Sequence, residues 1–178
     1  MNAITYKKLT LDNFNGHSLD LFRRYQEIDQ TLQKVNDNYV YISSPFTEDW
    51  NREKCRDVAK EIIEAISSGA ITYGAFFEGR IIGFAYLGTE LFGSNKQYIE
   101  LKIFQVSYEF RNKGIGKELF RLVCNDAKNA GAEKLYISAH PSKESQEAYS
   151  HLGCVFAKEV NQELAENEPF DIQMECTL

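Results

Sequence analysis

The chain has 178 residues, of which 43% are apolar and 26% are charged, and this combination predicts one globular domain over residues 1–178. Its formal net charge of -6 argues against binding to nucleic acids or anionic membranes, because phosphate surfaces select basic proteins. A positively charged partner is favoured instead. The first ten residues lack the apolar segment of a signal peptide and no apolar run is long enough to span a bilayer, so a cytoplasmic location is expected.

The N-terminal third is predicted to begin with a strand over residues 3–9. A helix is expected to start at Asp12 or Asn13 and to carry the apolar residues Leu19, Leu21, Phe22, Tyr25 and Ile28. Residues 36–50 combine turn signals and a proline with four aromatic side chains, and are predicted to form an irregular loop. This loop would either pin itself to the core by its aromatic rings or form the lid or wall of a substrate pocket.

The middle of the chain shows clearer periodicity. A helix is predicted through residues 58–66 and is expected to stop at Gly69. Two strands over residues 70–77 and 81–87 follow, joined by a tight turn that predicts a hairpin. Residues 98–106 alternate between apolar and polar side chains as a strand does, and residues 115–131 show the three-and-four spacing of an amphipathic helix.

The C-terminal third is predicted to contain a strand over residues 134–139, a short helix capped by Ser142 that ends near Gly153, and two strands over residues 154–157 and 170–176. The complete order is strand, helix, helix, three strands, helix, strand, helix and two strands. This order predicts a mixed α/β (α+β) fold in which helices flank a mixed central sheet. The cysteines contain no Cys-x-x-Cys pair, so we expect reduced core thiols and no metal site; they are Cys55, Cys124, Cys154 and Cys176.

The segment Arg111-Asn112-Lys113-Gly114-Ile115-Gly116 lies between a predicted strand and a predicted helix. The first turn of a helix has unpaired N–H groups and a partial positive charge, and glycines let an anion approach them closely. The segment therefore predicts a phosphate cradle, with an ordinary glycine-rich turn as the alternative. A dinucleotide fingerprint is disfavoured because Leu119 replaces its third glycine, and a P-loop is disfavoured because Glu118 follows Lys117.

With this element order, Arg111-x-x-Gly114-x-Gly116 resembles the acyl-CoA signature of the GNAT N-acetyltransferase superfamily. Tyr149-x-x-x-Gly153 also resembles that family, and the similarity is strong over residues 100–156. The resemblance implies a GNAT fold and acetyl-CoA as cosubstrate. It further implies transfer of an acetyl group to a primary amine of a small molecule or peptide, by direct attack in a ternary complex. A CoA-binding sensor, or an inactive partner domain without turnover, is the alternative.

The resemblance also implies which residues hold the donor. The strand that carries Phe104, Gln105 and Val106 would diverge from the next strand and bind the pantetheine arm through its backbone. Ser142 stands where the family usually has an asparagine that faces the cofactor, and Ser145 lies one turn further on. The pyrophosphate would lie over the segment made of Arg111, Asn112, Lys113, Gly114, Ile115, Gly116 and Lys117.

For catalysis, Tyr149 resembles the family's general acid, although a tyrosine in this place could also serve only for packing. Glu100 occupies the place of a glutamate that deprotonates the amine in several family members. Lys102 lies on the same strand face, so a solvated ion pair and a water chain are alternatives to this role. None of His17, His140 and His151 is expected to be catalytic.

The acceptor is not encoded in a motif. Acidic residues near the last strands would attract a cationic amine if they rim the acceptor site, and otherwise they form a solvated loop; these residues are Glu163, Glu166, Glu168 and Asp171. Edge strands near the C-terminus are compatible with a homodimer.

Overall fold

The computed structural model describes residues 3–178 and contains a seven-stranded sheet in the order β1-β4-β5-β6-β7-β9-β8. Strands β6 and β7 run parallel, whereas the other neighbouring pairs are antiparallel, so the sheet is mixed as predicted. The strands span β1 (Thr5–Lys8), β4 (Thr72–Phe77), β5 (Arg80–Phe92), β6 (Tyr98–Val106), β7 (Lys134–Ala139), β8 (Val155–Phe156) and β9 (Ile172–Thr177).

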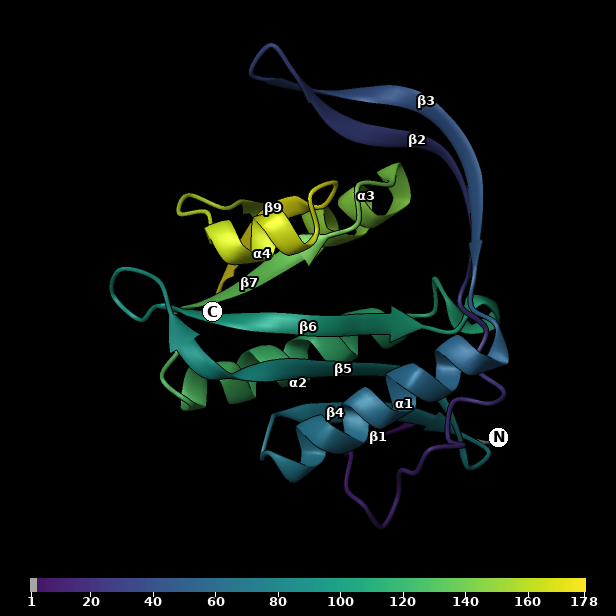
Figure 1. The fold of residues 1–178 in the computed structure, drawn as a ribbon. Coiled ribbons are helices and arrows are strands. Elements are labelled where there is room, and N and C mark those ends of the chain that lie inside the picture. The colour runs from purple at the N-terminus through teal and green to yellow at the C-terminus, as the bar shows by residue number, and fades with distance from the viewer. Residues whose placement is uncertain (1–2) are drawn as a thin grey trace.

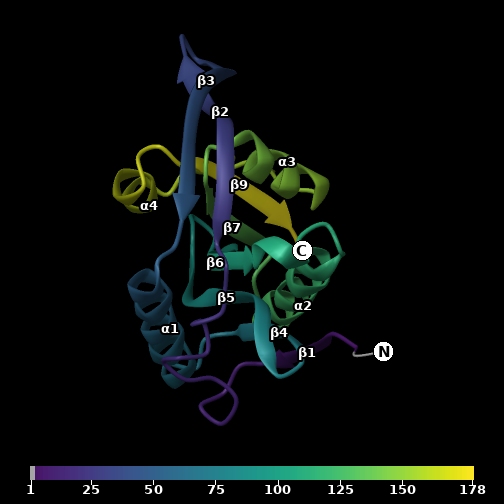
Figure 2. The same cartoon turned by 90° about the vertical axis from the view of Figure 1, so that its right-hand side faces the viewer.

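Helices cover both faces of this sheet. Helix α1 (Arg52–Ser67) packs on one face and α2 (Ile115–Asn129) on the other, while α3 (Lys143–His151) and α4 (Gln162–Asn167) lie beside the C-terminal strands (Figures 1 and 2). A short 3-10 helix, η1 (Tyr108–Phe110), joins β6 to the loop before α2. Within residues 3–178, no helix is both long and apolar enough to cross a membrane.

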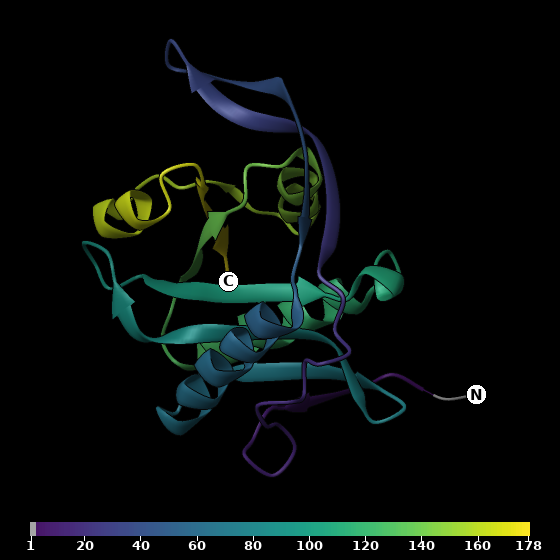
Figure 3. The same ribbon diagram turned by 45° about the vertical axis from the view of Figure 1, so that its right-hand side comes forward.

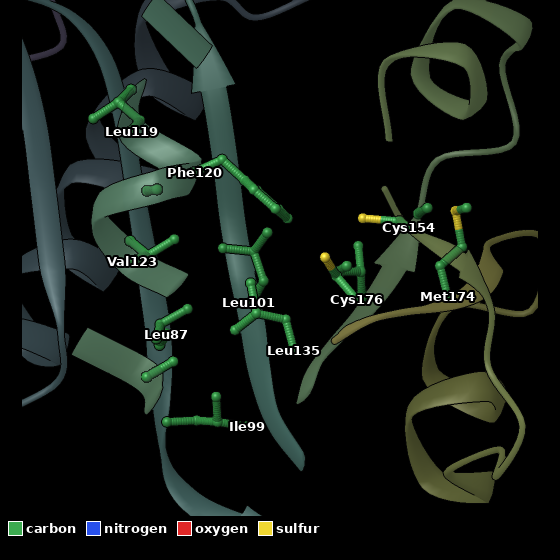
Figure 4. Packing of buried hydrophobic residues seen from close by; sticks show 14 of the residues in the cluster. Leu87, Ile99, Leu101, Leu119, Phe120, Val123, Leu135, Cys154, Met174 and Cys176 are labelled. Carbon is green, nitrogen blue, oxygen red and sulfur yellow. The ribbon is translucent and has the colours of Figure 1, made fainter. Parts of the chain in front are cut away.

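The core on the α2 side fixes this helix against the sheet. Leu119 and Val123 are fully buried and face β5 and β6, and Phe120 is 5% exposed (Figure 4). Gly83 of β5 makes the close approach possible, because a Cβ atom there would meet a methyl carbon of Leu119 at 3.0 Å. The buried Cys154 also belongs to this cluster, and its thiol is free. Tight packing holds the N-terminus of α2 in a defined place at the end of β6.

The prediction of a helix from Asp12 through Ile28 is wrong. Residues 11–13 and 16–21 form turns, and Tyr25–Val35 is strand β2. The predicted aromatic loop is wrong in the same way, because Asn38–Asp49 is strand β3 and pairs with β2 in a separate antiparallel sheet. We call this pair of strands the ribbon. It arches away from the main sheet and passes over α3 (Figures 1 and 3).

Alternation along β2 explains the ribbon. Ile28 and Leu32 are 1% and 7% exposed and face the body of the protein. Glu27, Asp29 and Gln33 beside them are exposed, whereas Thr31 is also buried. A two-residue turn with positive φ at Asn36 (49°) and Asp37 (65°) closes the hairpin, which is the turn geometry that matches strand twist. Ile28 pairs with Phe46 and Gln30 pairs with Ser43, so β3 has one more residue than β2 between these two pairs. This extra residue is a bulge near Pro45.

Candidate active site

A cleft opens where β6 and β7 diverge. The two strands pair at Tyr98, Ile99 and Glu100, and the pairing then stops, although β6 continues to Val106 and β7 to Ala139. In β6, Lys102 is an extra residue between the positions that pair with Tyr86 and Leu87 of β5, and such a bulge bends a strand. The resulting cavity has a volume of about 1270 Å³. The divergence predicted for the central strand is therefore present.

One end of the cleft is formed by the first turn of α2. Asn112 and Gly114 have φ values of 59° and 81°, and the chain enters the helix from this left-handed turn. Helices α1, α3 and α4 have a side chain that caps their first turn, but the Gly114 cap of α2 has none. The backbone N–H groups of this turn are therefore left for an anion, and the helix dipole adds a partial positive charge.

Glycine at position 116 keeps this turn open. A Cβ atom there would lie 3.2 Å from Cζ of Phe104, in the space between the helix and β6. A side chain would fill the cradle in which the pyrophosphate of an acyl-CoA is predicted to lie, so the residues present fit such a group.

The predicted pyrophosphate residues do not all face the cleft. Lys113 is exposed and donates from Nζ to the Glu109 carbonyl at 2.8 Å, and Ile115 is 1% exposed with its side chain in the core. Arg111 donates from Nε to the Val106 carbonyl at 3.1 Å, and its burial lowers its pKa. The predicted residues that do line the cleft are Arg111, Asn112, Gly114, Gly116 and Lys117.

The predicted pantetheine strand and the predicted acid meet in the same cavity. Phe104, Gln105 and Val106 line it from β6, and Tyr149 lines it from α3. The rings of Phe104 and Tyr149 are 6.2 Å apart. Burial raises the pKa of Tyr149, and its hydroxyl forms no hydrogen bond within residues 3–178. The phenol therefore stays protonated at neutral pH and has its proton free to donate.

Ser142 does not have the place predicted for it. It is 0% exposed, accepts from Nε2 of Gln26 at 2.8 Å and donates to Oγ of Ser145 at 2.9 Å. It also caps α3 by accepting from the Ser145 backbone N–H. The Ser142 hydroxyl thus makes its hydrogen bonds to the ribbon and to α3. The predicted contact of Ser142 with the cofactor is therefore not supported. Ser145 does line the cleft.

Glu100 lies at the inner end of the diverging strands. Its carboxylate is 2.7 Å from Nζ of Lys102, with 17% of its side chain exposed. Lys102 lines the cleft, whereas Glu100 is not among the described residues that do so. The base role of Glu100 stays a prediction.

Three cleft residues that sequence reasoning missed form a chain of polar contacts at the base of the ribbon. Nδ1 of His140 accepts from the Ser142 backbone N–H at 3.1 Å, so the other ring nitrogen, Nε2, carries the proton and donates to Glu48 Oε1 at 3.1 Å. The second oxygen of Glu48 pairs with Arg24 Nη2 at 2.7 Å, and Arg24 is 5% exposed. His140 directly follows the predicted strand over residues 134–139, and that position is a signal that could have identified it. Arg24 and Glu48 lie at the ends of ribbon strands that the sequence did not predict, so they had no such signal.

The acidic residues divide into two groups. Glu168 and Asp171 line the cleft, whereas Glu163 and Glu166 lie on α4 away from it. Burial raises the pKa of Asp171 to about 6; nearby His140 opposes this shift, and Glu168 and Glu48 add to it. No group of three or more side chains suited to a metal ion occurs within residues 3–178.

Comparison with known proteins agrees with this geometry. The model of the acetyltransferase (GNAT) family matches residues 35–154. A nourseothricin acetyltransferase structure is 14% identical, with a TM-score of 0.70 and 98% of both chains covered. A putative streptothricin acetyltransferase from Bacillus anthracis, in complex with acetyl coenzyme A, is 17% identical, with a TM-score of 0.72 and 99% of both chains covered.

A further solved structure is the PaiA N-acetyltransferase from Thermoplasma acidophilum in complex with coenzyme A, at 16% identity, a TM-score of 0.62 and 99% coverage of both chains. At these identities the three structures establish the fold, which is the one predicted. No curated protein sequence matches the chain. Because the family model covers well over half of the sequence, the chain belongs to the GNAT family of acetyltransferases.

Proposed function

We propose that this protein transfers an acetyl group from acetyl-CoA to a primary amine of a small molecule or peptide. One observation carries the proposal: the uncapped first turn of α2, the free part of β6 and Tyr149 all line one continuous cavity. This arrangement offers an anion site, an extended backbone edge and a proton donor in the order that an acyl-CoA thioester needs.

The chain's own residues supply three functions toward the donor. The backbone N–H groups after Gly114, together with Arg111 and Lys117, would hold the pyrophosphate. The edge of β6 that β7 leaves unpaired would hydrogen-bond the pantetheine arm at Phe104, Gln105 and Val106. Tyr149 would donate its proton to the departing thiolate, because its buried phenol stays protonated.

Direct attack by the amine is favoured over an acyl-enzyme. The side chains that line the cleft include no cysteine among the described residues, and the hydroxyl of Ser138 donates to Gln173 Oε1 at 3.0 Å. The hydroxyl of Ser145, which also lines the cleft, accepts from Ser142 Oγ at 2.9 Å and has no hydrogen bond to a base among the described residues. Because the cleft lacks an activated nucleophile, we expect both substrates to bind together in a ternary complex.

The acceptor is proposed to be cationic. Carboxylates on several elements line the cleft, among them Glu48, Glu168 and Asp171, and the whole chain carries a net charge of -6. The structures described above that are named for nourseothricin and streptothricin support a small-molecule amine acceptor.

The test is an acceptor panel assayed with acetyl-CoA, with thiol release followed continuously and acetylated products identified by mass spectrometry. The panel contains nourseothricin, spermidine, cadaverine and a lysine peptide. We expect at least one amine of the panel to be acetylated. When the concentrations of both substrates are varied, the double-reciprocal plots of the initial rate should give intersecting lines, as a ternary complex requires. Thermal stabilisation by CoA without any product would contradict the proposal and favour a CoA-binding sensor.

A further inference from the structure

Asp171 lies at the acceptor side of the cleft for a topological reason. Strand β9 begins at Ile172, which pairs with Ala139, the last residue of β7. Asp171 therefore comes beside His140, at the point where β7 has diverged from β6. Its backbone N–H donates to the Glu168 carbonyl at 3.0 Å, and this turn holds the residue at the cleft wall.

The carboxylate of Asp171 differs from the other carboxylates of the cleft. Glu48 uses both oxygens, one for His140 and one for Arg24, and Glu27 accepts from the Tyr25 hydroxyl at 2.6 Å. The remaining glutamates that line the cleft are exposed; they are Glu144, Glu147 and Glu168. Asp171 is partly buried and its side chain has no hydrogen bond or ion pair within residues 3–178.

His140 cannot take the role that this free carboxylate leaves open. Its Nδ1 lone pair is used by the Ser142 backbone N–H, and its Nε2 proton is donated to Glu48. No ring nitrogen of His140 is left to accept a proton from an incoming amine.

We propose that the carboxylate of Asp171 binds the ammonium group of the acceptor and takes the proton that the amine must lose before it attacks. This inference rests on the proposed acetyl transfer to an amine. It assigns to the start of β9 the acceptor site that no motif in the sequence marks, and it makes a primary ammonium the group recognised there.

The surrounding charges suit this task. His140 from the end of β7, Glu48 from the ribbon, Glu168 from the turn after α4 and Tyr149 from α3 face Asp171. Burial and the two glutamates raise its pKa to about 6, which makes the carboxylate a stronger base than an exposed aspartate. It is still mostly ionised at pH 7.5 and can attract a cation.

The proton and electron balance is complete without a further reagent. The ammonium N–H proton goes to Asp171, and the freed nitrogen lone pair forms the C–N bond to the thioester carbonyl. The C–S bond breaks, and its electron pair leaves on sulfur, which takes the phenol proton of Tyr149. The attacking nitrogen loses its second proton, which restores the Tyr149 phenol, and Asp171 releases its proton to solvent.

The kinetic test compares Asp171→Asn with Glu163→Gln, which removes the same charge from α4 outside the cleft. In the wild type, kcat/KM for the amine should fall below about pH 6. In Asp171→Asn this fall at low pH, the acidic limb of the profile, should disappear. At pH 7.5 the variant should have a kcat/KM for the amine about 100-fold lower than the wild type, with KM for acetyl-CoA changed less than twofold. Glu163→Gln should retain the wild-type profile. A limb that persists in Asp171→Asn and disappears in Glu100→Gln would overturn the proposal in favour of Glu100.

A direct measurement needs no turnover. Carboxyl carbons of Asp-labelled protein are titrated by NMR, with Asp171 assigned from the Asp171→Asn spectrum and cadaverine as the ammonium probe. We expect Asp171 to titrate near pH 6 and to shift to lower pH when cadaverine is added. A signal that is insensitive to cadaverine would overturn the assignment. If no amine in the panel is acetylated, the proposed function fails, while this titration still decides whether Asp171 binds an ammonium group.

Discussion

Nε2 of His140 lies 3.1 Å from Oε1 of Glu48, and this contact ties the end of β7 to the end of ribbon strand β3. The same glutamate holds Arg24, whose guanidinium is almost completely buried. The ribbon is thereby fixed across the open end of the cleft, although it shares no ladder with the main sheet. The ribbon thereby forms one wall of the cleft.

Removing the Glu48 side chain should therefore destabilise the protein. In Glu48→Ala, Arg24 keeps its charge in a buried place without a partner, and we expect the free energy of unfolding to fall by about 3 kcal/mol. Urea denaturation measures this loss. The double variant Arg24→Met, Glu48→Ala is the control and should recover most of the stability, because the unpaired charge is gone. Equal instability of the single and double variants would show that the ion pair is not the cause.

The left-handed residue before α2 predicts a second result. Gly114→Ala introduces a Cβ that meets no atom within 4 Å, but φ is 81°, so we expect a loss of about 1 kcal/mol from backbone strain and a raised KM for acetyl-CoA. Gly79→Ala is matched, since φ is 78° and its space is also empty. It should lower Tm similarly, by about 3 °C, and leave KM unchanged. If KM for acetyl-CoA rose equally in both variants, the increase would not be specific to the turn before α2. That turn would then have no particular role in donor binding.

Tyr149→Phe should lower kcat by about 100-fold and leave stability unchanged, because the lost hydroxyl makes no hydrogen bond in the described part of the chain. Since burial raises the pKa of Tyr149, activity should not decline up to pH 9 through loss of its proton.

Tyr98→Phe is the opposite case. Its hydroxyl donates to the buried Glu175 at 2.5 Å, so stability should fall by about 2 kcal/mol while kcat is retained. Calorimetry and stopped assays measure the two effects, and unchanged kcat in Tyr149→Phe would remove this residue from catalysis.

Ser142, the N-cap of α3, and Ser145 in its first turn should also respond differently. Ser142→Ala removes a buried cap and the partner of Gln26, and we expect about 2 kcal/mol of destabilisation with little change in KM for acetyl-CoA. Ser145→Ala removes a hydroxyl that lines the cleft and should raise that KM by about fivefold. Thermal unfolding and donor titrations test both. A raised KM in Ser142→Ala at full stability would restore the cofactor contact predicted from the sequence.

Asp171 should weaken the fold at neutral pH. Its folded pKa is raised from 3.8 to about 6, so the folded state disfavours the charge, and stability is lost as pH rises through this interval. Asp171→Asn should therefore increase the free energy of unfolding by about 1 to 2 kcal/mol at pH 8, after allowance for partial solvent exposure, and by almost nothing at pH 4. Denaturation at both pH values measures the difference. A gain of equal size at both would show that ionisation is not involved.

Most elements from residue 52 onward could be predicted from the sequence because they have a regular period, whereas the six-residue helix α4 was not predicted. The strand over residues 98–106 alternates, and the helix after Gly114 repeats at three and four residues. The proposed donor site is local in sequence, since one strand, one turn and one helix start provide most of it. A pattern that spans twenty residues can therefore identify it.

The ribbon could not be predicted because its buried face mixes polar and apolar residues. Gln26 is 8% exposed and is buried since Ser142, 116 positions away, accepts its hydrogen bond. Ile28 then falls three residues after Tyr25 and imitates helical spacing. The acceptor side likewise depends on contacts between distant segments, such as His140 with Glu48. Periodicity carries no information about such pairs.

The ribbon's strands bond to each other along their length, and β2 meets the body through contacts such as Leu32 N–H to the Pro141 carbonyl at 2.7 Å. Tyr39 and Tyr41 of the ribbon are exposed and contact Phe156 and Lys143 through their rings, so substitutions there should leave the hydrogen bonds of the main sheet untouched. Mutation can thus alter one hairpin without touching the proposed donor site. In evolutionary terms, the fold would let selection vary the ribbon independently of that site.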